Sequence, residues 1–321
     1  MKILANDGID AVGKQQLEAA GFTVITEKVA QEQLAATLHQ ENYIGLLVRS
    51  ATTARAELID ACPNLKFIGR GGVGIDNIDA EYARSKGVVV FNTPASSSQS
   101  VAELVMSLMF ATVRGVYDAG GNMPANGAAQ FEALKKKYGK GTELRGKTLG
   151  IIGFGRIGQS LASYALGCGM KVVAVDRNDS IPPVKLTIEG YGEINVNIPC
   201  VPMSDVLGQS DFISLHVPKQ PNGSAVIGAD EMAQLKKGVV LINTSRGGVI
   251  EEKSLIEYLD NGHIGAACLD VFVGEPKPDA ALLAHPKVIA TPHIGAATLE
   301  AQERIGLEIA EKVKEIMTAK V

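Results

Sequence analysis

The stretch TLGIIGFGRIG (residues 148–158) decides the fold of the second half of this chain. A short apolar run leads into a motif with glycine at positions 153, 155 and 158. The first glycine permits a tight turn, the second lets a bound group approach the backbone, and the third lets a helix pack closely on the strand. Helical spacing then runs from Arg156 to Leu166. The segment predicts a strand, a tight turn and a helix whose first amide groups face an anion.

The next predicted strand, KVVAVD (171–176), strengthens this interpretation. It ends at Asp176, 18 residues after Gly158. A carboxylate at that place accepts hydrogen bonds from ribose hydroxyls and repels a 2′-phosphate. The sequence therefore predicts dinucleotide binding, with NAD favoured over NADP. Arg177, which follows directly, could instead accommodate the phosphate of NADP.

Short β-like runs alternate with helical patterns along both halves of the chain, which predicts two doubly wound α/β domains with parallel sheets. Helical patterns in the first half include Ala11–Ala20 and Glu32–Gln40. The strand candidates are 2–6, 22–26, 44–49, 65–70 and 88–92, then 148–153, 171–176, 211–217, 238–244, 265–271 and 287–292.

Four other segments fall outside this alternation. An apolar helical stretch covers Ser100–Tyr117, and the Gly, Asn and Pro residues of 120–130 predict a loop after it. Two alternating runs around Gly190 predict a β-hairpin within 181–202. The stretch Leu299–Ala319 has the apolar spacing of one amphipathic helix.

Composition excludes several classes of protein. With 46% hydrophobic and 21% charged residues in 321, the chain is neither disordered nor of low complexity. A net charge of −4 without a basic stripe argues against nucleic-acid binding. The most apolar stretch, Val101–Val113, is too short to span a membrane. We expect a soluble cytoplasmic protein. Widely spaced cysteines predict no metal site and a reducing compartment: Cys62, Cys168, Cys200 and Cys268.

Polar residues follow three strands of the second half. Arg246 lies in NTSRGG (243–248), Asp270 and Glu275 lie in LDVFVGEP (269–276), and His293 lies in ATPHIGAAT (290–298). In open α/β sheets, ligands bind beyond the carboxyl ends of the strands. We therefore expect these side chains to converge.

Taken with GFGRIG, these motifs resemble those of the D-isomer-specific 2-hydroxyacid dehydrogenases, in the same order and over nearly the whole chain. The resemblance implies a discontinuous, flavodoxin-like substrate domain made of residues 1–98 and 293–321. It also implies a Rossmann NAD-binding domain of residues 99–292, a cleft that closes on the ligand, and a homodimer built largely on the NAD domain.

The resemblance also implies a catalytic triad. His293 would take the hydroxyl proton as hydride leaves the substrate, Glu275 would favour the imidazolium through the other ring nitrogen, and Arg246 would hold the substrate carboxylate. The implied cofactor contacts are Val73, Gly153, Gly155, Arg156, Ile157, Gly158, Asp176, His216, Val217, Pro218, Thr244, Ser245, Arg246, Asp270, His293, Gly295 and Ala296.

Two segments of the first domain, VRSAT (48–52) and GRGGVGIDNID (69–79), resemble the 3-phosphoglycerate dehydrogenase branch of the family. Arginines at adjacent strand ends could bind a phosphate, and glycine-rich backbone could bind a carboxylate. Alternatively, the arginines are ordinary surface or ion-paired residues. Ser97 stands where the family usually has Asn, a departure at a substrate contact. The predicted substrate contacts are Arg49, Ser50, Arg70, Gly72, Val73, Gly74 and Arg246.

These features predict NAD-dependent oxidation of 3-phospho-D-glycerate to 3-phosphohydroxypyruvate, a step of serine biosynthesis. One alternative is a glyoxylate or hydroxypyruvate reductase, or another D-2-hydroxyacid dehydrogenase of the same family. The other is an NAD-sensing binding protein like the C-terminal binding protein corepressors.

Overall fold

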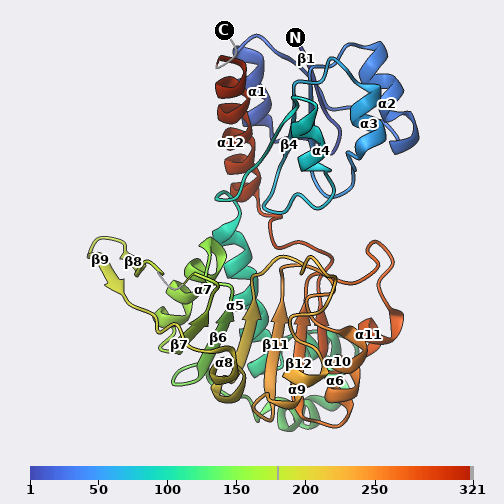
Figure 1. Ribbon diagram of the computed structural model, residues 1–321. Coiled ribbons are helices and arrows are strands. Elements are labelled where there is room, and N and C mark those ends of the chain that lie inside the picture. The colour runs from blue at the N-terminus through green and yellow to red at the C-terminus, as the bar shows by residue number, and fades with distance from the viewer. Residues whose placement is uncertain (179–180, 319–321) are drawn as a thin grey trace. The chain divides into compact units, whose positions relative to one another are not determined.

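The computed structural model describes residues 1–178 and 181–318 and shows two compact α/β units (Figure 1). The first unit comprises Met1–Ser100 and the segment that begins at Ala296, and the second comprises Val101–Gly295. His293 therefore lies in the second unit, a few residues before the changeover.

The first unit is built on a parallel five-stranded sheet of order β2-β1-β3-β4-β5, the flavodoxin-like order expected from the sequence. Its apolar strands are buried because helices cover both faces, as right-handed crossovers require. The strands are β1 (Lys2–Ala5), β2 (Thr23–Ile25), β3 (Gly45–Val48), β4 (Phe67–Arg70) and β5 (Val89–Asn92). The helices are α1 (Ala11–Ala19), α2 (Gln31–Gln40), α3 (Ala56–Ala61), α4 (Ala80–Ser85) and α12 (Leu299–Thr318).

Helix α12 comes from the far end of the chain and lies beside α1 (Figure 1). A Cβ atom on Gly13 would lie 2.5 Å from the Cα atom of Gly306, so two glycines allow the helices to touch. Ile305, Ile309 and Val313 enter the same apolar cluster as β1. Burying each of these side chains contributes about 1.5–3 kcal/mol, which explains why the amphipathic segment returns to this unit.

The second unit contains a parallel six-stranded sheet of order β13-β12-β11-β10-β6-β7. Cys200 adds a parallel bridge to Ala174 of β7, at the place of the third strand in the 3-2-1-4-5-6 Rossmann order. The strands are β6 (Thr148–Ile152), β7 (Lys171–Val175), β10 (Phe212–Leu215), β11 (Val239–Asn243), β12 (Ile264–Leu269) and β13 (Val288–Ala290).

Alternation along β6 explains why this sheet is covered on both faces. Ile151 packs in one apolar cluster with Met109 and Leu161, whereas Ile152 packs in another with Leu255. The helices of this unit are α5 (Ser98–Arg114), α6 (Val116–Tyr138), α7 (Arg156–Gly167), α8 (Met203–Gln209), α9 (Ala229–Ala233), α10 (Glu252–Asp260) and α11 (Ala280–Ala284).

The hairpin prediction for residues 181–202 is confirmed by the antiparallel strands β8 (Val184–Ile188) and β9 (Gly192–Val196). The loop predicted for 120–130 is wrong, because α6 runs through it with Pro124 inside and a break at Gln130. The Asp118 carboxylate accepts a hydrogen bond of 2.7 Å from the Tyr138 hydroxyl and pairs with Lys137 at 2.6 Å. These contacts join the two ends of α6 across the break at Gln130.

Over residues 1–178 and 181–318, no single helix has the length and apolar character needed to cross a membrane. Only α5 and α6 taken together, bent by 60° at their junction, reach that length and composition. The same residues contain no group of three or more His, Cys, Asp and Glu side chains arranged to hold a metal ion.

Candidate active site

The glycine motif forms the tight turn between β6 and α7. Gly153 has a φ of 91°, and a Cβ atom there would lie 2.5 Å from the carbonyl oxygen of His216. A Cβ atom on Gly158 would lie 2.5 Å from the carbonyl oxygen of Gly153. At Gly155, by contrast, a Cβ atom would meet nothing within 4 Å. Packing thus requires the first and third glycines, and the second leaves open space in front of the α7 amides, where a pyrophosphate fits.

Asp176 connects the end of β7 to this turn through a hydrogen bond. Its Oδ2 accepts a hydrogen bond of 2.6 Å from the Phe154 N–H, and its Oδ1 accepts one of 2.9 Å from the Asn178 N–H. A carboxylate has about four acceptor positions, so these two bonds leave capacity for ribose hydroxyls. Arg156 and Ile157, predicted pyrophosphate contacts, are the first residues of α7.

Two buried polar atoms at the carboxyl ends of β10 and β11 have no partner among the described residues: Nδ1 of His216 and Oγ1 of Thr244. The His216 Nε2 lies 2.9 Å from the Ser214 hydroxyl. Burial lowers the pKa of His216 to about 4, so the ring is neutral at physiological pH. Buried polar groups are normally hydrogen-bonded, and a polar cofactor would supply the missing partners. The turn, Asp176 and these two atoms therefore fit a dinucleotide.

The predicted acid–base pair is formed. The Nδ1 of His293 lies 2.9 Å from the Oε2 of Glu275, and both side chains are more than one-third exposed. The Oε1 of Glu275 accepts a hydrogen bond of 2.9 Å from the Phe272 N–H. Because Nδ1 faces Glu275, Nε2 is the nitrogen left to exchange a proton with a ligand.

Asp270 fixes the backbone around His293. Its side chain is fully buried, and its Oδ1 accepts hydrogen bonds from the Thr291 hydroxyl (2.6 Å) and the Ile294 N–H (2.8 Å). Its Oδ2 accepts one from the Gly295 N–H at 2.9 Å. His293 itself has a φ of 55°, which few residues other than glycine adopt. Asp270 therefore stabilises an unfavourable conformation that aims the imidazole.

The loop that carries Arg246 contacts the loop that carries Glu275. A Cβ atom on Gly247 would lie 1.9 Å from the Phe272 carbonyl oxygen, so only glycine fits there. Asn243 shapes the Arg246 loop by accepting from the Ser245 N–H (3.0 Å) and donating to the Arg246 carbonyl oxygen (2.8 Å). The structure thus brings the two loops together, as their positions after neighbouring strands predict.

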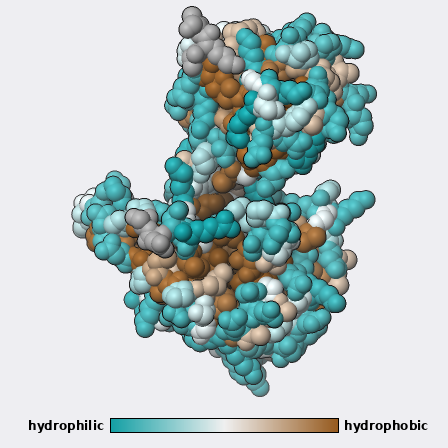
Figure 2. Space-filling view, in the orientation of Figure 1, coloured by the Kyte–Doolittle hydropathy of each residue, from teal (hydrophilic) through white to brown (hydrophobic). Residues whose placement is uncertain are grey.

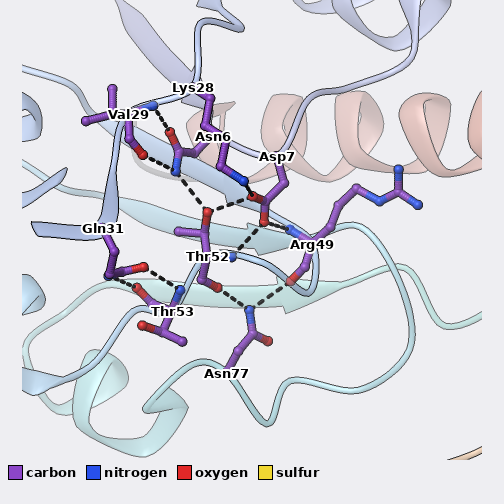
Figure 3. A network of polar contacts seen from close by, with 9 residues as sticks. All are labelled: Asn6, Asp7, Lys28, Val29, Gln31, Arg49, Thr52, Thr53 and Asn77. Carbon is purple, nitrogen blue, oxygen red and sulfur yellow. Dashed lines mark hydrogen bonds and ion pairs between the residues drawn. The ribbon is translucent and has the colours of Figure 1, made fainter. Parts of the chain in front are cut away.

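The first unit has a polar network where β1 and β3 end (Figure 3). The Asp7 carboxylate accepts hydrogen bonds from the Arg49 N–H (2.7 Å), the Thr52 N–H (3.0 Å) and the Thr52 hydroxyl (2.7 Å). The Arg49 guanidinium extends away from this network. A pocket of about 340 Å³ lies beside the Asp7 network. It is lined by Asn6, Asp7, Gly8, Thr26, Lys28, Arg49, Ser50 and Ala51.

Arg70 ends β4, next to Arg49 in the sheet, and folds back over Gly72. A Cβ atom on Gly72 would lie 2.7 Å from the Nη1 of Arg70, and the φ of Gly72 is 141°. The Gly72 N–H donates to the Thr93 hydroxyl at 2.8 Å. Val73 is exposed and Gly74 is half-buried in the same turn.

Two further residues singled out in the sequence lie in the first unit: Ser97, where the family usually has Asn, and Ala296, an implied cofactor contact. Ser97 is buried in the turn before α5, where the Ser96 carbonyl oxygen accepts a 3.0 Å hydrogen bond from the Arg304 Nε. The Ala296 carbonyl oxygen accepts one of 2.6 Å from the Gln302 side chain. Sequence reasoning missed Asp7 and Lys28. Asp7 directly follows the strand KILAN, so the rule that polar residues at strand ends form sites would have found it.

Comparisons with known proteins agree with this architecture. Residues 106–295 match the model of the D-isomer specific 2-hydroxyacid dehydrogenase, NAD binding domain. Hydroxypyruvate reductase of Thermotoga maritima is 41% identical over 316 residues, which cover 97% of each chain. D-3-phosphoglycerate dehydrogenase of Methanocaldococcus jannaschii is 40% identical over 99% of this chain, which spans only 57% of that protein.

A solved structure shows the same arrangement of elements. D-lactate dehydrogenase from Aquifex aeolicus, complexed with NAD and lactic acid, has a TM-score of 0.78 and 27% identity, covering 99% of this chain and 96% of that one. Family model, sequence relatives and solved structure all point to the same family. The chain therefore belongs to the D-isomer-specific 2-hydroxyacid dehydrogenases, and its second unit is an NAD-binding domain.

Proposed function

We propose that this protein catalyses the NAD-dependent interconversion of 3-phospho-D-glycerate and 3-phosphohydroxypyruvate, a step of serine biosynthesis. The observation that carries the chemistry is the 2.9 Å contact between Glu275 and His293, beside the loop of Arg246. NAD, when bound, supplies the hydride acceptor.

The side chains have distinct tasks. His293 receives the hydroxyl proton on Nε2 during oxidation and returns it during reduction. Glu275 holds Nδ1 and stabilises the positive charge that the ring then carries. Arg246 binds the substrate carboxylate through its fork of donors. We assign the NAD contacts to the glycine turn, Asp176, His216 and Thr244.

The substrate phosphate is assigned to Arg49 and Arg70, and we take the first unit to be the substrate domain. Arg49 reaches out of the Asp7 network beside a pocket that Lys28 also lines (Figure 3). Lys28 Nζ lies 3.4 Å from Asp7 Oδ1, and its side chain is 63% exposed. A phosphate dianion needs neutralising charge: Arg49 and Lys28 line this pocket beside one carboxylate, and Arg70 ends the neighbouring strand β4.

The direct test is NADH oxidation by the purified protein with 3-phosphohydroxypyruvate, hydroxypyruvate and glyoxylate in parallel. We expect kcat/KM to be highest for the phosphorylated acid. A second candidate function is hydroxypyruvate reduction, which the 97% mutual coverage with the Thermotoga maritima reductase favours. Equal or higher kcat/KM on hydroxypyruvate would support that candidate.

Arg49→Ala tests the phosphate assignment. Hydrogen bonds to charged groups contribute about 1.5–3 kcal/mol, so kcat/KM for the phosphorylated acid should fall about 10- to 100-fold. For glyoxylate it should fall less than about threefold. Arg55→Ala is the matched control, since Arg55 pairs with Asp79 at 2.8 Å and does not line the pocket. Equal losses on both substrates would contradict the assignment.

We also propose that the protein forms a homodimer through its second unit. The two helices before the glycine turn expose large apolar side chains, which a monomer seldom does. Light scattering should give twice the 33.7 kDa mass of one chain, and Phe131→Glu should shift the protein towards monomer. The exposed residues are Phe110, Val116, Tyr117, Met123 and Phe131.

A further inference from the structure

The loop of residues 271–276, which carries Glu275, has little side-chain anchoring of its own. Val271 and Phe272 are buried, but Val273, Gly274 and Glu275 are exposed. Gly274 has a φ of 78°, so its backbone conformation is open to few other residues. An exposed loop of this kind keeps one conformation only if hydrogen bonds hold its backbone.

Two successive amides of this loop donate to two different carboxylates. The Phe272 N–H donates to Glu275 itself, at 2.9 Å. The Val273 N–H donates to the Oε1 of Glu252 at 2.7 Å. Glu252 is the half-buried first residue of α10, 23 positions before Glu275 in the sequence. It therefore connects the end of a rigid helix to the loop.

We propose that Glu252 is a positioning residue for the reaction: its hydrogen bond to Val273 fixes the 271–276 loop in the conformation from which Glu275 reaches His293. Glu252 does not touch His293 or the expected substrate position. It acts through the backbone between Val273 and Glu275. Neither the family resemblance nor the motif spacing assigned it a role.

The electrostatics of Glu252 agree with this placement. Its pKa is raised, chiefly by burial, and further by the charges of Asp279 and Glu275, while the Val273 N–H acts in the opposite direction. The negative charges of Glu252 and Glu275 therefore repel each other, so their proximity is unfavourable by itself. The hydrogen bond from the Val273 N–H offsets this repulsion.

The residue beside it, Glu251, provides a matched control. It is exposed, it precedes α10 as its N-cap, and its carboxylate accepts a hydrogen bond from Ser254 of the same helix. Among the described residues, its side chain makes no hydrogen bond to the 271–276 loop. Glu251→Ala therefore removes a carboxylate of the same kind without touching the proposed contact.

The kinetic experiment compares Glu252→Ala, Glu252→Gln and Glu251→Ala, and it rests on the proposed dehydrogenase activity. Because misplacement by about 1 Å can cost about 100-fold in rate, we expect Glu252→Ala to lower kcat by about 10- to 100-fold. The Kd for NADH should stay within about twofold, since the glycine turn is untouched. The Gln variant keeps an acceptor oxygen, so its kcat should return to within about threefold of the parent.

A second readout does not need turnover. With ¹⁵N-labelled histidine, the chain gives signals from only five His residues, and His293→Asn assigns the relevant one. In Glu252→Ala we expect the His293 Nδ1 resonance to move towards its position in Glu275→Ala, while Glu252→Gln and Glu251→Ala match the parent protein.

These outcomes separate the two ideas. If the parent protein reduces no 2-keto acid, the proposed function fails, and the histidine spectra still decide the role of Glu252. An unchanged His293 resonance in a folded Glu252→Ala protein would overturn the positioning role. So would a Glu252→Gln protein as impaired as Glu252→Ala, because the negative charge rather than the hydrogen bond would then matter.

Discussion

The carboxyl ends of the two parallel sheets share one arrangement of polar groups but differ in its surroundings. Each has an aspartate at the end of a strand that gathers donors from a neighbouring loop: Asp7 after β1 and Asp270 after β12. Asp270 is fully buried, and its partners all belong to the segment 291–295, which contains His293. Asp7 instead lines an open pocket and faces Lys28.

The difference indicates a separate role for the carboxyl end of each sheet. Around Asp270, hydrogen bonds fix the backbone on both sides of His293, and among the described residues no cation donates to this carboxylate. Around Asp7, the same kind of bond holds Arg49 by its backbone and leaves its guanidinium directed outward (Figure 3). We infer that the carboxyl end of the second unit's sheet fixes the geometry around His293. The carboxyl end of the first unit's sheet instead presents the charge of Arg49. In the space-filling view, hydrophilic side chains cover much of the visible surface of each unit (Figure 2).

The strongest test of this contrast is Asp270→Ala. It would leave the Thr291 hydroxyl and the Ile294 and Gly295 amides without their acceptor. Each unsatisfied buried donor costs about 1–3 kcal/mol, so we expect the free energy of unfolding to fall by about 3 kcal/mol or more. Because His293 loses its backbone support, kcat should fall about 100-fold or more. Urea unfolding and steady-state kinetics measure both, and a folded variant with near-normal kcat would show that Asp270 does not position His293.

Asp7→Asn should have a smaller effect, and one on stability more than on kcat. Burial opposes ionisation of Asp7, but the Arg49 N–H, the Thr52 donors and Lys28 outweigh it and hold its pKa below the ordinary 3.8. A lowered carboxylate pKa stabilises the fold above the unfolded value and loses that contribution as the pH falls through the folded value. The variant should therefore be about 1–2 kcal/mol less stable at pH 7.

The pH dependence provides the check on Asp7. The stability difference between parent and variant should shrink as urea unfolding is repeated below pH 3.8. With hydroxypyruvate, kcat should stay within about threefold of the parent value, because no contact to His293 changes. A kcat loss as large as that of Asp270→Ala would contradict the separate roles assigned to Asp7 and Asp270.

The sequence predicted the features that depend on neighbouring residues or on strand ends. The glycine turn can be predicted because the spacing of its three glycines is local in the sequence, and Glu275 and His293 follow strands whose order can be inferred. The course of α6 through Pro124 was not readable, because its stability involves Asp118 and Tyr138, 20 positions apart. Glu252 was missed for a similar reason. Its partner is a backbone amide 21 positions away, and backbone amides leave no trace in a sequence.

The smallest predicted effect at pH 7 concerns His216, a ring after β10 that burial keeps uncharged. Burial lowers its pKa from 6.5 to about 4, so between these values the unfolded chain binds a proton that the native protein does not. Stability should therefore fall as the pH drops from 7 to 4.5, and His216→Gln should remove about 2 kcal/mol of that loss, at about 1.4 kcal/mol for each pH unit between the two pKa values. His39→Gln, at an exposed position on α2, is the control substitution. If parent and His216→Gln lose stability in parallel, burial does not hold the ring neutral.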